Sequence, residues 1–84
     1  MKNEKVLLSD MKISQTGVVV ELHGGQVMLS KLSTLGIRVG KRIKKLSQQA
    51  MRGPVVIEIG RSQVAIGFGM AGKVLIEVAE GEER

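Results

Sequence analysis

Glu21 and His23 are the residues of this chain whose types and spacing come nearest to a metal site. They lie two positions apart, so on a β-strand both side chains would point to the same face. Two such ligands could hold a divalent cation weakly, with water or a neighbouring chain completing the coordination shell. Transition-metal sites usually need three or four protein ligands, and the chain has one histidine and no cysteine. We therefore treat this pair as a weak metal candidate and predict no bound cofactor.

Two further patterns suggest chemistry but lack the context that the chemistry needs. Residues 67–72 spell G-x-G-x-x-G, the fingerprint of dinucleotide-binding folds. That fingerprint opens a helix whose amides point at a pyrophosphate, whereas the following run, 73–78, has the pattern of a strand. The glycines are expected instead to let the chain turn between two strands. Ser9 and Lys12 match S-x-x-K without its partner motifs. The sequence therefore predicts a protein that is not an enzyme.

Basic residues are concentrated in the middle of the chain. The formal net charge is +5, and residues 31–73 contain nine lysines and arginines against a single acid, Glu58, whereas four of the last eight residues are glutamates. This asymmetry indicates an acidic partner surface or nucleic acid. Single-stranded nucleic acid is usually held on aromatic side chains, and Phe68 is the one aromatic residue here, so nucleic acid is the less favoured partner. An ordinary solvated face is the third explanation.

Short strands separated by glycine turns account for most of the chain. β-branched or alternating runs predict strands at 18–22, 41–46, 55–59, 64–66 and 74–78, the second of them less regular than the rest. Turns are expected at Gly53-Pro54 and at Gly60, on either side of the 55–59 strand. Five strands with one short helix inserted after the first long strand predict an all-β fold, a small SH3-like barrel. We assign residues 8–78 to this single domain, 1–7 to a frayed N-terminus and 79–84 to an acidic tail.

An amphipathic helix is predicted for residues 26–35. A narrow apolar stripe runs along it at helical spacing, made of Met28, Leu32 and Leu35. Val27 and Leu29 flank the stripe and widen the apolar arc to about 200°, whereas a surface helix usually buries an arc of about 100°. Part of this surface is therefore expected to stay exposed as a protein-binding site. The alternative is that the barrel and neighbouring loops cover both flanks.

Gly36 is expected to end this helix, because glycine readily takes the left-handed conformation that terminates many helices. Ile37 would then pack back onto the last helical turn, and Gly40 marks a second turn before the next strand. The helix is therefore short, and a strand follows it almost at once.

The order of these elements resembles the FeoA family. The likeness is carried by Leu32-Ser33-Thr34-Leu35-Gly36-Ile37-Arg38-Val39-Gly40, by Gly53-Pro54 and the 57–66 hairpin after it, and by the earlier Leu8-Ser9-Asp10-Met11-Lys12. It extends over about residues 8–78 and lies in the ordered combination rather than in any single piece. One departure is visible: the family tends to carry Pro-Gly after its opening Leu-x-x-Leu-Lys, where this chain has Ile13-Ser14.

This resemblance implies a non-enzymatic, cytoplasmic accessory protein of ferrous iron uptake. The implied partner is the cytosolic, GTP-hydrolysing part of the membrane transporter FeoB. No apolar run reaches the roughly 20 residues that cross a bilayer, so we expect no direct membrane insertion. The residues expected to face the partner are Val27, Leu29, Lys31, Arg38, Lys41, Arg42, Lys44, Lys45 and Arg52.

Two other functions stay open at this point. One is a small basic barrel that binds nucleic acid through phosphate contacts. The other is a stand-alone SH3-like domain that acts on a separate metal-dependent repressor, because the chain also resembles the C-terminal domain of DtxR-type regulators. Self-association is left open as well.

Overall fold

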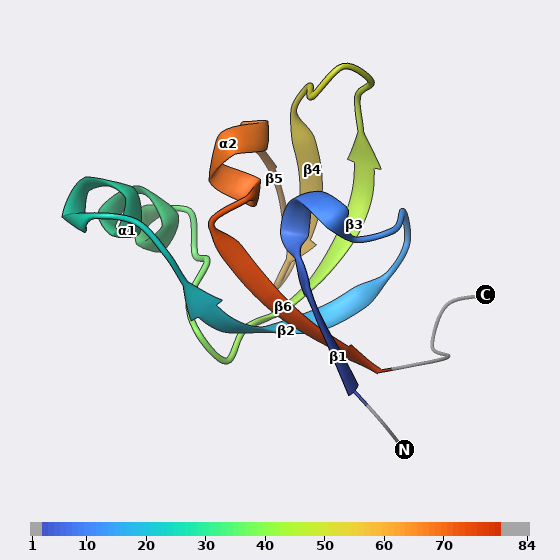
Figure 1. The fold of residues 1–84 in the computed structure, drawn as a ribbon, viewed down its shortest axis with the longest axis horizontal. Coiled ribbons are helices and arrows are strands. Elements are labelled where there is room, and N and C mark those ends of the chain that lie inside the picture. Colours follow the sequence, from blue (N-terminus) through green and yellow to red (C-terminus); the bar gives the residue numbers. More distant parts are fainter. Residues whose placement is uncertain (1–2, 80–84) are drawn as a thin grey trace.

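The computed structural model describes residues 3–79, and Figure 1 shows how their helices and strands are arranged. The elements follow one another as β1 (Asn3–Leu7), the 3₁₀ helix η1 (Leu8–Asp10), β2 (Thr16–Leu22), α1 (Gln26–Thr34), β3 (Arg42–Gln48), β4 (Val55–Ile59), β5 (Ser62–Ile66), α2 (Phe68–Ala71) and β6 (Val74–Ala79). Residues 80–84 of the predicted acidic tail lie outside the described residues. Within residues 3–79, no helix is both long enough and apolar enough to cross a membrane.

The strands form one antiparallel sheet of six, in the order β1-β6-β2-β3-β4-β5. The prediction of five strands was wrong, and so was that of fraying for residues 3–7, because β1 pairs with β6 along its whole length, from Asn3 opposite Ala79 to Leu7 opposite Leu75. Residues 1–2 of the predicted frayed segment lie outside the described residues. The reason is tertiary. β1 is an edge strand with only two apolar residues, Val6 and Leu7, and the neighbouring strand supplies the pairing that its own pattern does not predict.

The core is aliphatic and lies inside the curved sheet. The predicted alternation of β4 and β6 is confirmed. Among the described residues, fourteen buried apolar side chains make up the core: Leu8, Met11, Val19, Leu32, Ile37, Ile43, Val55, Ile57, Ile59, Ile66, Ala71, Val74, Ile76 and Val78. The hairpin of β4 and β5 turns at Gly60, which has φ +62.

Two local irregularities explain where the strands differ from prediction. β3 changes register with β4 between Lys45 and Ser47, so its side chains do not alternate cleanly and the sequence signal is weak. β2 begins before Gly17, not after it. A Cβ at Gly17 would lie 2.4 Å from Cγ2 of Ile76 and 2.8 Å from the carbonyl oxygen of Glu77, so glycine is required here for close packing of β2 on β6.

The loop before β2 contains the departure from the family pattern. Ser14 has φ +75, a left-handed conformation that glycine adopts without strain and serine does not. The Ser14 N–H donates to the carbonyl of Lys45 at 2.7 Å, which ties this loop to β3. The turn geometry is therefore that of a glycine at this position, although the residue is serine.

Candidate protein-binding site

The end of α1 has the glycine-based geometry expected from the sequence. Gly36 has φ +88, and its N–H donates to the carbonyl of Ser33 at 2.9 Å. The N–H of Ile37 donates to the carbonyl of Leu32, also at 2.9 Å. Together these bonds form a Schellman motif, and the buried Ile37 side chain anchors it in the core. This anchoring sets the direction in which α1 projects from one end of the barrel (Figure 1).

The apolar arc of α1 is only partly covered. Leu32 is buried, and Met28 and Leu35 are half-buried against the core. Val27 is 72% exposed and Leu29 is 37% exposed. The prediction of an uncovered apolar flank is confirmed most clearly for Val27, and the alternative, that the barrel covers both flanks, is wrong.

A shallow groove of about 340 Å³ separates α1 from α2 and is lined by Ser30, Lys31, Thr34, Leu35 and Met70. Val27 lies three and four positions before Ser30 and Lys31, so it is on the same side of the helix as the groove and extends it by one turn. Leu29 lies on the other side of α1. The groove and Val27 together form an apolar surface with a lysine beside it, which we call the α1 groove surface.

Lys45 was predicted to face a partner, and this prediction was wrong. Its side chain is only 1% exposed, and its Nζ donates to the carbonyl oxygens of Leu8 (3.2 Å), Ser9 (3.1 Å) and Met11 (2.7 Å). Burial lowers the pKa of the Lys45 ammonium below its usual value, and the negative charge of Asp10 opposes that shift. Lys45 therefore holds the carbonyl groups of η1 in place and is part of the fold.

The other predicted basic residues do not share one face. Lys31 lines the α1 groove surface. Arg38 donates from Nε and Nη2 to the Oγ and carbonyl oxygen of Ser33, at 3.3 and 3.4 Å, beside the end of α1. Lys41 and Arg42 are exposed where β3 begins. Arg52 lies in the loop beyond the other end of β3, with its guanidinium 6.0 Å from the ring centre of Phe68.

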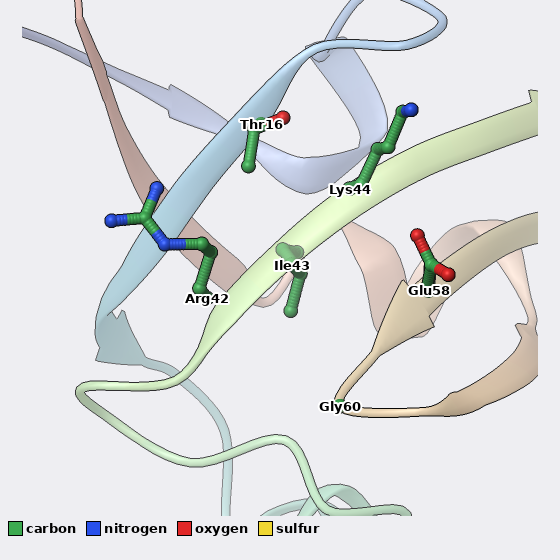
Figure 2. Close-up of a pocket in the computed structure, with 6 residues that line it drawn as sticks. All are labelled: Thr16, Arg42, Ile43, Lys44, Glu58 and Gly60. Carbon is green, nitrogen blue, oxygen red and sulfur yellow. The ribbon is translucent and has the colours of Figure 1, made fainter.

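A second hollow, of about 300 Å³, lies on the outer face of β3 and is lined by Thr16, Arg42, Ile43, Lys44, Glu58 and Gly60. Figure 2 shows Arg42 and Lys44 projecting from β3 while Glu58 projects from the neighbouring strand β4. Lys44 and Glu58 are direct cross-strand partners. Because a carboxylate borders the hollow beside the two basic groups, the site is less suited to a polyphosphate backbone than the basic sequence alone suggests.

Glu21 and His23 do point to the same place. The Nε2 atom of His23 lies 3.7 Å from Oε1 of Glu21, and both side chains are half-exposed. Among the described residues, no group of three or more histidine, cysteine or acidic side chains could hold a metal ion. The pair offers two ligands at most, fewer than transition-metal sites usually use.

Residues 67–72 contain a short helix, α2, where only a turn was expected. Met70, which was not among the predicted site residues, lies here and forms one wall of the α1 groove surface. Met70 and Leu35 line the same groove although they are 35 positions apart, and no local pattern in the sequence signals this. Arg52 and Phe68 lie close together in the same way, although they are 16 positions apart in the sequence.

Comparison with known proteins assigns this chain to a family. The family model of the FeoA domain matches residues 6–78. The chain belongs to the FeoA family. A protein of Methanocaldococcus jannaschii named Fe(2+) transport protein A is 33% identical over 73 residues, which are 87% of each chain. A crystal structure of an iron uptake regulatory protein, FeoA, superposes with a TM-score of 0.84 at 36% identity, covering 89% of this chain and 100% of the other.

The same fold is found in a larger regulator. A manganese-dependent transcriptional repressor superposes with a TM-score of 0.84 at 19% identity, and the match covers 94% of this chain but 44% of the repressor. At this identity the likeness concerns the fold alone. The SH3-like fold predicted from the sequence is confirmed, with six strands in place of five.

Proposed function

We propose that this FeoA-family chain is a non-enzymatic cytoplasmic accessory protein of ferrous iron uptake, and that it binds the cytosolic, GTP-hydrolysing part of a FeoB-type membrane transporter through the α1 groove surface. The observation that carries the proposal is the exposure of Val27 beside the groove between α1 and α2. Family membership and the relative named for Fe(2+) transport support the iron-uptake role.

The α1 groove surface has the chemistry of a protein-binding site. Burying a valine completely is worth about 1.5–3 kcal/mol, and Val27 is 72% exposed, so a partner that covers it would gain about 1–2 kcal/mol there. Leu35 and Met70 offer further apolar surface in the groove. Exposed apolar side chains around a hollow, bordered by polar groups, are typical of interaction sites.

Charge defines the kind of partner surface that would fit. α1 contains Lys31 and no acidic residue, and Arg38 lies beside its C-terminal end. A complementary surface therefore places an apolar side chain in the groove and acidic groups around it. Such charge complementarity speeds association and selects the partner more than it adds affinity.

The experiment is a calorimetric titration of the full chain into the purified cytosolic GTPase domain of the transporter. Val27→Asp places a charge in the interface and removes the apolar contact, so we expect binding to weaken about five- to thirtyfold or more. Ile13→Asp is the matched control, because Ile13 is also exposed (53%) but lies in the η1–β2 loop, far from α1 (Figure 1). Circular dichroism verifies that both variants fold.

Leu29→Asp tests whether the partner contacts the side of α1 that faces away from the groove. If the partner contacts only the groove side, Leu29→Asp leaves binding close to that of the wild type, whereas a partner that wraps α1 loses affinity for both variants. Undiminished binding of Val27→Asp would overturn the assignment of this surface. No binding by the wild-type chain at high micromolar concentration would overturn the proposed partner.

A further inference from the structure

The sheet has two edges, and they differ in how they are protected. β1 and β5 each pair with one neighbour only among the described residues. β1 carries the exposed charges Glu4 and Lys5, which are of the kind that discourages pairing with another chain. β5, Ser62–Ile66, carries no charge and no proline, and its pairing with β4 shows no register shift. The β5 edge therefore lacks the usual protective devices.

The backbone of β5 is suited to accept another strand. Ile59 pairs with Ser62 across a two-residue turn, so this pair closes the hairpin with hydrogen bonds. In an antiparallel ladder the bonded positions alternate, which directs the N–H and C=O groups of Gln63 and Ala65 away from β4. Both residues are exposed, and within residues 3–79 neither forms a further backbone hydrogen bond.

The charges at the two ends of this edge are positive, whereas Glu58 of β4 lies opposite Gln63 and also pairs with Lys44 of β3. The exposed Arg61 directly precedes β5. Phe68 follows the other end of β5, two residues after Ile66, and the guanidinium of Arg52 lies over its ring. No acidic residue occurs from 59 to 76. We propose that the β5 edge is a strand-addition site for an extended acidic segment of another protein.

A second copy of this chain fits the β5 edge poorly. Pairing β5 with β5 in antiparallel fashion would bring Arg61 of each copy to the Ile66 end of the other, where Arg52 lies. Like charges facing each other across a strand pair are destabilising. An acidic segment would instead place a carboxylate near each arginine while its backbone bonds to Gln63 and Ala65. This mode of recognition uses main-chain hydrogen bonds for affinity, and it does not depend on the α1 groove surface.

The test uses a synthetic peptide and the full chain. β5 spans about 17 Å, at about 3.3 Å per residue for five residues. The probe is a nine-residue capped peptide with alternating valine and threonine in the centre and two glutamates at each end. The control peptide has lysines in place of the glutamates. Backbone NMR of the isotope-labelled protein reports the site, because amide hydrogen exchange at Gln63 and Ala65 should slow at least tenfold when the acidic peptide binds.

Two variants separate strand addition from general charge attraction. Ala65→Pro removes the outward N–H at an edge position, where proline is tolerated, and should weaken peptide binding at least tenfold. Ala65→Thr keeps the N–H and should bind like the wild type. The exchange measurement on the wild-type chain decides the question even if Ala65→Pro does not fold. The proposal is overturned if millimolar acidic peptide leaves exchange at 63 and 65 unchanged, or if the lysine peptide protects these amides equally.

Discussion

Gly36→Ala tests whether α1 ends on a left-handed residue that the fold requires. A Cβ at Gly36 would meet no atom within 4 Å, so the substitution introduces no clash. It does place a side chain at φ +88, and the strain of that conformation is about 1–2 kcal/mol. In a domain of this size each kcal/mol lowers Tm by about 4–8 °C, so we expect Tm to fall by about 4–16 °C.

Gly69→Ala is the matched control for this experiment. Gly69 lies inside α2, also has no atom within 4 Å of an added Cβ, and does not have a positive φ. Alanine is favoured over glycine in a helix by about 0.5–1 kcal/mol, so Tm should stay the same or rise. Thermal unfolding followed by circular dichroism measures both variants. An unchanged Tm for Gly36→Ala, or an equal fall in both variants, would refute the role assigned to the helix end.

Three further changes have effects of known direction. Ser14→Gly should raise Tm by a few degrees in thermal unfolding, because it relieves a side chain at φ +75. Gly17→Ala should lower the free energy of unfolding in urea by about 1–3 kcal/mol, since the new Cβ meets Ile76 and a backbone oxygen. The pKa of Lys45 is lower in the folded chain than its ordinary 10.5, so the unfolded chain holds the proton more tightly. The free energy of unfolding should therefore rise as the pH approaches 10.5, and Lys45→Met should lack this rise.

Local signals predicted what depends on neighbouring residues. The φ of Gly36 and the bond from Ile37 to Leu32 follow from one glycine placed after an amphipathic run. The exposure of Val27 follows from an apolar arc wider than one packing face can cover. In both cases the relevant information lies within a few residues of the site.

Long-range contacts decided the rest. β1 is a strand because β6 lies beside it, and the groove is formed by residues as far apart in sequence as Leu35 and Met70. Lys45 is a different case, because a signal was present. It lies two positions after the buried Ile43, and residues two apart on a strand share a face, so the same alternation that buries the isoleucine also buries the lysine. The charge of Lys45 concealed this pattern.

Among the described residues, two polar side chains are buried, Gln15 and Lys45, and both serve the fold. Gln15 accepts a hydrogen bond from the N–H of Lys12 at 3.0 Å, and Lys45 binds three carbonyl groups of the neighbouring segment, so both serve to hold the chain before β2. Among residues 3–79, no buried side-chain nitrogen or oxygen lacks a hydrogen-bond partner. The interior polar groups are thus committed to the fold, and the recognition we propose is at the α1 groove surface and the β5 edge. Val27→Asp should change partner binding while leaving the free energy of unfolding within about 0.5 kcal/mol of the wild type, whereas Lys45→Met should lower the free energy of unfolding and leave partner binding unchanged.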